Sequence, residues 1–315
     1  MSQSLSQGAT LQSKWKGLGG SVGRMIAPPS RMKGFLFGLP GEGKSAFIQS
    51  HPDGYIFNLD ASSTTTPNPS AVIFPGVDPE TGRAVGDNGE HIVLTYDYIE
   101  AKVAKLIALA AANEPRPETI FFDSISAWIS LLIQWIPPNA AKLGISREPA
   151  SDWKQLHGPA AWDTLYSIIT TTITKLHNAG YGVYVIGHVV NAKIPLEENR
   201  FIVKPELTIT DGLWKRLYHM FELSALIHRE EVQEVKEIPQ TVKRSDGRTE
   251  SFMHKKTVST LKVRLTVSKL ELAGIAKARV PLPANIDLPL DTGWRTFTDA
   301  YNTAAASISS TPPAP

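Results

Sequence analysis

The sequence contains no cysteine, so disulfide bonds and thiolate metal sites are excluded. It also has no uninterrupted apolar run of the length that a membrane-spanning helix needs. Its N-terminal residues are rich in Ser, Gln and Gly, and they lack the apolar segment of a signal peptide. These three absences predict a soluble, cytoplasmic protein that does not bind membranes.

A strong charge imbalance is also missing, because the formal net charge is only +2 over 315 residues. The basic residues are nevertheless unevenly placed. Residues 1–41 carry five Lys or Arg and no acidic residue, and residues 240–280 carry ten Lys or Arg against three acidic residues. Such basic segments are typical of nucleic-acid binding, but a solvated tail and a solvated hairpin have the same composition. Both interpretations are open at this point.

One stretch, residues 38–45, fits the phosphate-binding loop pattern G-x-x-x-x-G-K-[ST] at every fixed position. Glycines allow consecutive backbone N–H groups to curve around a phosphate. Lys44 is expected to reach the β- and γ-phosphates of a nucleotide, and the Ser45 hydroxyl is expected to bind Mg²⁺. The predicted ATP-binding residues are Gly38, Leu39, Pro40, Gly41, Glu42, Gly43, Lys44 and Ser45.

The residues around this loop favour a nucleotide site over a chance glycine-rich turn. Residues 34–37 form a short apolar run, which is typical of a buried parallel strand, and a helical pattern follows at 45–49. Short apolar strands and helices alternate from there to residue 188, which predicts βαβ units and a mainly parallel sheet. The other strands are expected at 54–60, 91–96, 119–124 and 183–188, and the other helices from 97, at 125–135 and at 160–178.

The chain divides into three predicted parts. A flexible basic arm at 1–30 precedes an α/β domain at 31–290. The part of this domain at 222–285 is β-rich and includes a polar, charged loop at 240–256. A C-terminal segment follows at 291–315, and its Ala-, Ser-, Thr- and Pro-rich end is expected to be disordered from about residue 304.

Asp123 is the predicted partner of the phosphate loop. It ends the apolar run 119–122, and a carboxylate at the C-terminal end of a strand adjacent to the loop can bind Mg²⁺ together with Ser45. The simpler alternative is a strand-end aspartate that caps the following helix. We interpret Asp123 as the second metal-binding residue.

The order of these motifs resembles the RecA-like ATPase core. The phosphate loop is followed by strands that end in Asp60, Asp123 and His188. The resemblance implies a RecA-like P-loop NTPase fold in which His188 senses the γ-phosphate and couples it to a DNA-binding loop. RecA-like enzymes usually carry a catalytic Glu just past the position of Asp60, whereas this chain continues with Ala61 and Ser62. Asp60 is expected to position the attacking water in its place; otherwise hydrolysis should be slow or absent, and the protein would act as an ATP-binding switch.

A second stretch, residues 272–279, is similar to the K-x-R element of RecA-like helicases and recombinases. That resemblance implies that Lys277 and Arg279 reach the γ-phosphate of a neighbouring subunit, in the manner of an arginine finger. A solvated basic turn is the alternative. Over about residues 33–285 the chain looks like the short phage P-loop ATPases of RecA-like type, including single-strand annealing proteins. This group implies an oligomer, as a ring or a filament, that acts on DNA in the host cytoplasm, with or without a partner protein.

In the RecA-like arrangement, the loops after the Asp123 helix and the His188 strand face a central channel or filament axis. The corresponding stretches here are 137–151 and 189–211, which offer cations for phosphates and an aromatic ring for base stacking. The second stretch also holds four acidic residues, so an ordinary surface loop of mixed charge is the alternative. The candidate nucleic-acid-binding residues are Lys142, Arg147, Lys193, Arg200, Phe201 and Lys204.

Together these observations predict a Mg²⁺-dependent ATPase that acts on single-stranded DNA in phage recombination or replication. One alternative is a P-loop phosphotransferase, which would need an arginine-rich lid over its acceptor. Another is an ATP-gated oligomeric scaffold with little hydrolysis, which the missing Glu favours. The candidate catalytic residues are Lys44, Asp123, Asp60, His188, Lys277 and Arg279.

Overall fold

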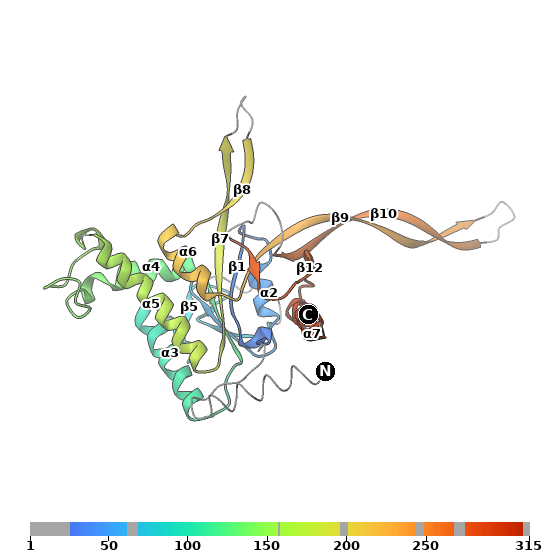
Figure 1. Cartoon of the computed structure of the whole chain (residues 1–315). Coiled ribbons are helices and arrows are strands. Elements are labelled where there is room, and N and C mark those ends of the chain that lie inside the picture. Colours follow the sequence, from blue (N-terminus) through green and yellow to red (C-terminus); the bar gives the residue numbers. More distant parts are fainter. Residues whose placement is uncertain are drawn as a thin grey trace, which may run out of the picture.

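The computed structural model describes residues 26–61, 69–156, 158–195, 201–243, 249–267 and 275–310. The expected arm at 1–30 lies almost wholly outside this range. A central sheet has the strand order β12-β10-β9-β1-β7-β6-β2-β3 (Figure 1). The neighbours from β9 to β3 are parallel, and β10 and β12 are antiparallel. In this order the strands are Asn285–Asp287, Thr249–Thr266, Leu223–Lys243, Lys33–Gly38, Gly182–Pro195, Thr119–Asp123, Gly54–Asn58 and Val72–Phe74.

Four short strands complete the β-structure. β8 (Phe201–Leu207) pairs with β7, β11 (Lys277–Ala278) pairs with β9, and β4 (Gly76–Val77) and β5 (Ala84–Val85) form a small hairpin. The helices are α2 (Lys44–Gln49), α3 (Tyr96–Ala111), α4 (Ile125–Trp135), α5 (Pro159–Asn178), α6 (Asp211–Met220) and α7 (Gly293–Ser310), with 3₁₀ turns at Pro29–Arg31, Pro137–Asn139 and Trp153–Gln155. In the part of the chain that the structure describes, no helix has the length and apolarity needed to span a bilayer.

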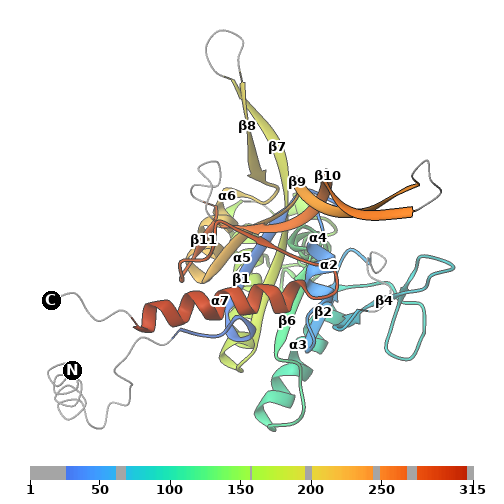
Figure 2. The same cartoon turned by 90° about the vertical axis from the view of Figure 1, so that its right-hand side faces the viewer.

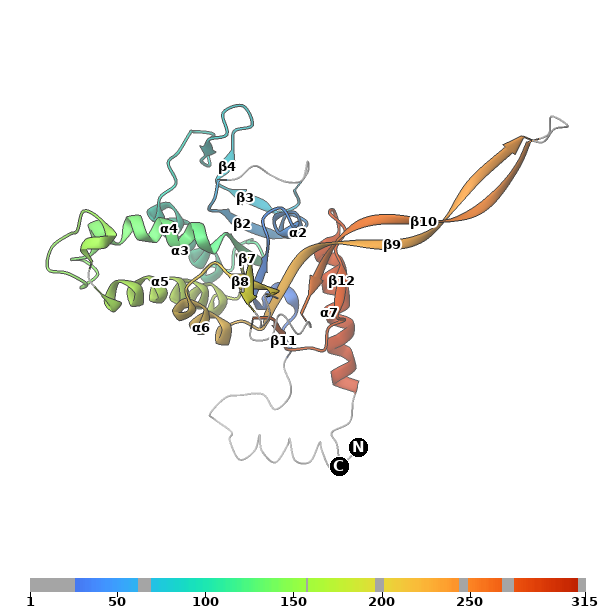
Figure 3. The ribbon, with the colours of Figure 1, turned by 90° about the horizontal axis from the view of Figure 1, so that it is seen from above.

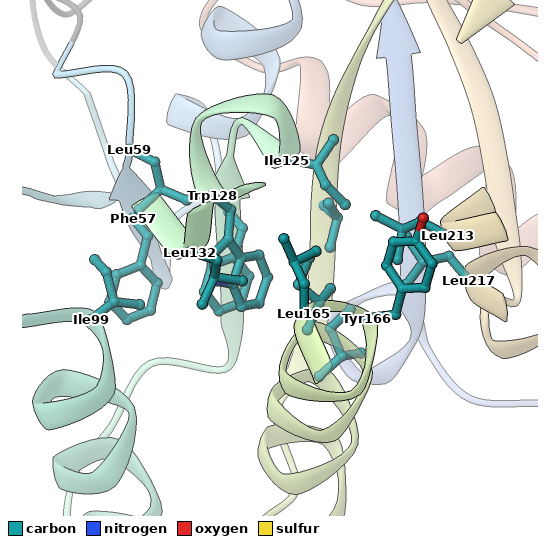
Figure 4. Close-up of a cluster of buried hydrophobic side chains, with 14 of the residues drawn as sticks. Phe57, Leu59, Ile99, Ile125, Trp128, Leu132, Leu165, Tyr166, Leu213 and Leu217 are labelled. Atoms are coloured by element: carbon teal, nitrogen blue, oxygen red, sulfur yellow. The ribbon is translucent and has the colours of Figure 1, made fainter. Parts of the chain in front are cut away.

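Helices cover both faces of the parallel strands (Figure 3). Successive strand side chains point to opposite faces, so Phe122 of β6 packs against α3, α4 and α5 while Phe121 packs against α2 and α7. Figure 4 shows the first of these layers, where Trp128 of α4 and Leu165 of α5 lie among other buried side chains. Strands buried on both faces need apolar residues at every position, which explains the continuous apolar runs. The predicted fold class, an α/β core with a mainly parallel sheet and C-terminal antiparallel strands, is confirmed.

The second layer depends on the C-terminal helix. Trp294 of α7 packs its ring against Phe121, Tyr184 and Phe47, with centroids 5.3–5.5 Å apart. Further along α7, Ala304 is buried in the same cluster. The disordered tail predicted from about residue 304 is therefore wrong up to Ser310, because the small side chains of this segment pack as a helix against the sheet (Figure 2). Residues 311–315 lie outside the described range.

His51, which follows α2, makes the stability of this layer depend on pH. Its side chain is only 1% exposed, its Nδ1 accepts the Asp53 N–H (3.0 Å), and burial lowers its pKa to about 4. The unfolded chain, with a histidine pKa near 6.5, binds more protons between these values, so stability falls as pH falls through that window. We expect this group to make the protein about 2 kcal/mol less stable at pH 5 than at pH 7.

Urea unfolding of the wild type and of His51→Asn at the two pH values measures this effect. Asparagine keeps a side-chain acceptor for the Asp53 N–H but does not titrate, so its pH dependence should be smaller by about 2 kcal/mol. Equal pH dependence in the two proteins would contradict the prediction.

Three predicted boundaries differ from the structure. The strand predicted to end at His188 continues to Pro195 and turns back as β8, so the expected loop 189–211 begins as a hairpin. The loop predicted at 240–256 is mostly strand, because β9 runs to Lys243 and β10 starts at Thr249. The strand predicted at 91–96 contributes one bridge at His91, and Tyr96 already begins α3. In the two hairpins, backbone pairing continues beyond the buried part of the sheet, where apolar patterning does not mark it.

Candidate nucleotide-binding site

The predicted phosphate loop joins β1 to α2 at the carboxyl edge of the sheet. Gly43 has a φ of +95°, a conformation that side chains disfavour, and a Cβ there would lie 3.0 Å from Val263 of β10. Gly38 ends β1, and a Cβ there would lie 2.1 Å from the carbonyl oxygen of Ile227 in β9. The glycines are therefore required both by the turn and by the base of the β9–β10 hairpin, which packs against the loop.

Lys44 lies within this loop and is only 4% exposed. Its Nζ donates to the carbonyl oxygens of Gly38 (2.9 Å) and Leu39 (2.7 Å). Burial lowers its pKa, while the carboxylates of Asp123, Glu42 and Asp60 oppose that shift. Main-chain carbonyls thus hold the ammonium at the loop, and an anionic phosphate would be a stronger partner than they are.

Ser45 and Asp123 meet directly, because the Ser45 Oγ donates to Asp123 Oδ2 over 2.7 Å. The strand that carries Asp123 is not the sheet neighbour of β1, because β7 lies between β1 and β6. The two side chains still meet because the carboxyl ends of parallel strands share one edge. Burial raises the pKa of Asp123 to about 6, and Asp60 adds to the rise. A buried carboxylate with a raised pKa gains most from a cation beside it.

Asp60 lies two residues past the end of β2, on the exposed side of the same site. Its carboxylate oxygens accept from the Ser124 Oγ at 3.1 and 3.3 Å. The same hydroxyl caps α4 by accepting the Ala127 N–H (3.5 Å). The sequence interpretation missed Ser124, although a serine directly before an apolar helix is a typical N-cap. Ser62, which stands near the expected position of the catalytic Glu, lies outside the described residues.

His188 lies beside the loop but not at a strand end. It is the register partner of Gly38 across β1 and β7. Burial and the charge of Lys44 lower its pKa, so the ring is neutral near pH 7. Within the described part of the chain, its Nδ1 is buried without a hydrogen-bond partner.

Lys277 and Arg279 lie at the other end of β1. Arg279 pairs with Glu222 (3.1 Å), whose other carboxylate oxygen accepts the Lys33 N–H at the start of β1 (2.8 Å). The Lys277 Nζ donates to the Tyr218 carbonyl oxygen and lies 4.1 Å from the centroid of the Tyr218 ring. By register, Arg279 is level with the start of β1 and Lys277 with Phe35, so neither is level with the end of β1, where the phosphate loop of the same chain begins. A role at a neighbouring subunit's nucleotide stays a prediction.

The predicted nucleic-acid-binding residues are distributed over two elements. Lys142 and Arg147 are exposed in the turn after α4. Lys193 of β7 and Lys204 and Phe201 of β8 belong to the projecting hairpin, where the structure describes the backbone only (Figure 2). Arg200 lies outside the described residues. The two sets are not part of the nucleotide site.

The profile of the AAA domain family matches residues 30–265, which is most of the chain. Among solved structures, a KaiC-like protein from the hyperthermophilic archaeon Pyrococcus horikoshii is similar at 10% identity and a TM-score of 0.29, over 76% of this chain and 87% of that chain. No curated protein matches. The chain belongs to the AAA domain family, and with its phosphate loop on a mainly parallel sheet it is a P-loop NTPase.

Proposed function

We propose that this protein is a Mg²⁺-dependent ATPase that acts on single-stranded DNA, in phage recombination or replication, as an oligomer. The observation that carries the ATPase part is the 2.7 Å hydrogen bond between Ser45 and Asp123 beside the buried Lys44. A hydroxyl, a carboxylate and an ammonium at a glycine-rich loop are the groups that position and neutralise a transferred phosphoryl group.

The residues present fit a magnesium ion. In the described part of the chain no cluster of three or more His, Asp or Glu could hold a metal alone. Mg²⁺ in nucleotide sites takes one or two protein ligands and completes its shell with water and phosphate oxygens, so Ser45 and Asp123 are sufficient to hold it. When bound, the ion would neutralise charge on the phosphates. A bound cation would also offset the cost of burying the charged Asp123 carboxylate, whose pKa is raised by burial.

Asp60 is the residue of this chain that we assign to the attacking water. Its carboxylate is exposed to solvent, and the Ser124 hydroxyl fixes its orientation. It is also close enough to influence the pKa of both Lys44 and Asp123. A carboxylate that faces water beside the phosphates can orient a nucleophile and accept its proton.

The experiment that tests the function is ATP hydrolysis by the purified protein with and without single-stranded DNA. We expect turnover that requires Mg²⁺, rises several-fold with DNA, and is absent in Lys44→Ala, because the ammonium that binds the phosphates is lost. Lys105→Ala, an exposed lysine of α3, is the matched control and should behave as the wild type.

Tight ATP binding with no turnover under either condition would overturn the ATPase proposal and favour the ATP-gated scaffold. Light scattering with and without ATP then measures whether the nucleotide changes the oligomeric mass. Turnover that DNA leaves unchanged would overturn the DNA part alone.

A further inference from the structure

The β9–β10 hairpin projects from the body as a long arm (Figures 1 and 3). Its two strands pair with each other from Leu226–Thr266 out to Lys243–Thr249, whereas β1 pairs with β9 only over Leu223–Leu226. An isolated two-stranded ribbon is marginally stable in water. An arm of this length therefore gains stability from a partner that covers it.

We propose that the outer part of this arm binds the phosphate backbone of single-stranded DNA through Lys236, Lys255 and Lys256. The inference rests on the proposed function and names a binding surface for its DNA substrate. Residues 236–256 carry six Lys or Arg against three acidic residues, so this segment alone is more positive than the whole chain at +2. A segment of that charge attracts a polyanion.

Cross-strand pairing brings like charges together at this position. Lys236 and Lys256 are register partners on β9 and β10, so their side chains lie on the same face of the ribbon, where like charges destabilise the pair. Lys255 precedes Lys256 and points to the opposite face. A DNA strand that crosses the ribbon therefore meets cations on both faces, and its phosphates relieve the repulsion between the paired lysines.

The outer lysines are weakly neutralised, in contrast to the basic residues at the base of the arm. Lys236 and Lys255 are 51% and 73% exposed, and their acidic neighbours Glu234 and Glu237 lie 3.7 and 4.0 Å away, at the limit of an ion pair. Exposed pairs of this kind contribute little. Two basic residues of the base have close partners: Lys262 pairs with Glu234 (2.5 Å) and Asp287 (2.9 Å), and Arg264 with Glu230 and Asp287 (both 2.8 Å).

A second copy of this chain fits the arm less well than a polyanion. Among the described side chains of the ribbon, the exposed large apolar residues are Val235, Met253 and Leu261. Met253 and Leu261 lie eight residues apart on β10, and Val235 is opposite Thr257, midway between them, so neighbours are about 13 Å apart along the ribbon. The described side chains therefore form separate points and not the contiguous apolar patch that a protein interface needs at its centre. The charge of the outer arm is the feature that distinguishes it from the rest of the surface.

The base of the arm also contacts the phosphate loop. The Arg229 N–H of β9 donates to the Glu42 carboxylate, and Val263 of β10 lies against Gly43. DNA held on the arm and a nucleotide held in the loop would therefore both contact the β9–β10 hairpin. The stimulation of hydrolysis by DNA should depend on the arm.

Fluorescence anisotropy with a labelled single-stranded oligonucleotide tests this surface on the full chain. In Lys236→Ala/Lys255→Ala/Lys256→Ala, each lost phosphate contact should weaken binding about fivefold at 0.1 M salt, so the affinity should fall about 100-fold. The slope of log K against log salt concentration should become less negative by about 2 in this variant. The triple Lys→Arg variant should keep wild-type affinity within a few-fold because the charge is retained.

The matched control is Lys105→Ala/Lys175→Ala/Lys215→Ala, which removes the same charge from exposed positions of α3, α5 and α6 and should bind as the wild type. Thermal unfolding by circular dichroism establishes that each variant is folded. Wild-type protein that does not bind the oligonucleotide overturns the proposed DNA function together with this inference. If the wild type binds the oligonucleotide and the arm variant binds it equally well, the arm site alone is overturned. If that variant also has a changed mass in light scattering, the arm contacts a second copy of the chain instead.

Discussion

Replacing Asp123 with asparagine is expected to lower ATP hydrolysis about 100-fold or more, and to make the nucleotide-free protein about 2 kcal/mol more stable at pH 7.5. Burial raises the pKa of Asp123 to about 6, whereas the unfolded chain has a value near 3.9. Above both values the carboxylate is charged in either state, and the folded state carries the cost of burying it. Asparagine removes that charge and still accepts the hydrogen bond of Ser45.

The loss of activity has a separate cause from the gain in stability. Asparagine offers a metal a neutral oxygen in place of a negative one, so the charge that faces a bound cation beside Ser45 disappears. Phosphate release at saturating ATP and Mg²⁺ measures the first effect, and urea unfolding without nucleotide measures the second. Asp299→Asn, an exposed position of α7, is the control and should change neither.

Unchanged hydrolysis in Asp123→Asn would remove this residue from the catalytic site. A variant less stable than the wild type would mean that the ionised carboxylate stabilises the fold. The two measurements together distinguish a functional carboxylate from an ordinary helix cap, which was the sequence-based alternative for Asp123. A cap should gain little stability when its charge is removed and should leave hydrolysis intact.

The parallel core was predictable because its signals are local. β6 is apolar on both faces, with Phe121 and Phe122 in opposite layers. A short apolar run without polar positions is typical of a parallel strand buried on both faces. The phosphate loop is eight consecutive residues, and the strand and helix patterns that confirm it lie directly beside it in the sequence. Ser124 could have been predicted too, because it directly precedes an apolar helix and has the residue type of an N-cap.

The neighbours within the sheet were not predictable from the same signals. The position of β7 between β1 and β6 depends on which strands pair, and apolar runs do not encode partner choice. His188 was taken as the end of its strand because the apolar run stops there. Backbone pairing with β8 continues the strand to Pro195, but residues 191–195 lack the continuous apolar run by which the buried strands were predicted.

The β9–β10 arm illustrates the same limit. Residues 240–256 have the polar composition of a loop, and the side chains that the structure describes there are all exposed, so they carry no pattern of burial. Charge is the one property of this segment that the sequence shows clearly. It left two interpretations open for the basic segment at 240–280, a nucleic-acid surface and a solvated hairpin. The structure shows the hairpin, and the like-charged register of Lys236 and Lys256 is the new argument for the nucleic-acid surface.

Replacing Trp294 with alanine is expected to destabilise the protein by about 3–5 kcal/mol, one of the largest effects available outside the nucleotide site. Its side chain is 4% exposed and contacts Phe47 of α2, Phe121 of β6 and Tyr184 of β7. Removing an indole from such a cluster loses its transfer free energy and leaves a cavity that the surrounding strands cannot close. Urea unfolding at pH 7 measures the change.

Leu290→Ala, four residues earlier and 59% exposed, is the matched control and should change stability by less than about 0.5 kcal/mol.

The comparison of these two variants also tests the extent of the domain, because the family match ends at residue 265 while α7 packs directly behind the helix of the phosphate loop. The Trp294 N–H donates to the Ser50 Oγ at the end of α2 (3.0 Å). A cost below about 1 kcal/mol for Trp294→Ala would mean that α7 does not dock in solution. A cost of about 3–5 kcal/mol would mean that residues beyond the family match hold the nucleotide-binding helix α2 in place.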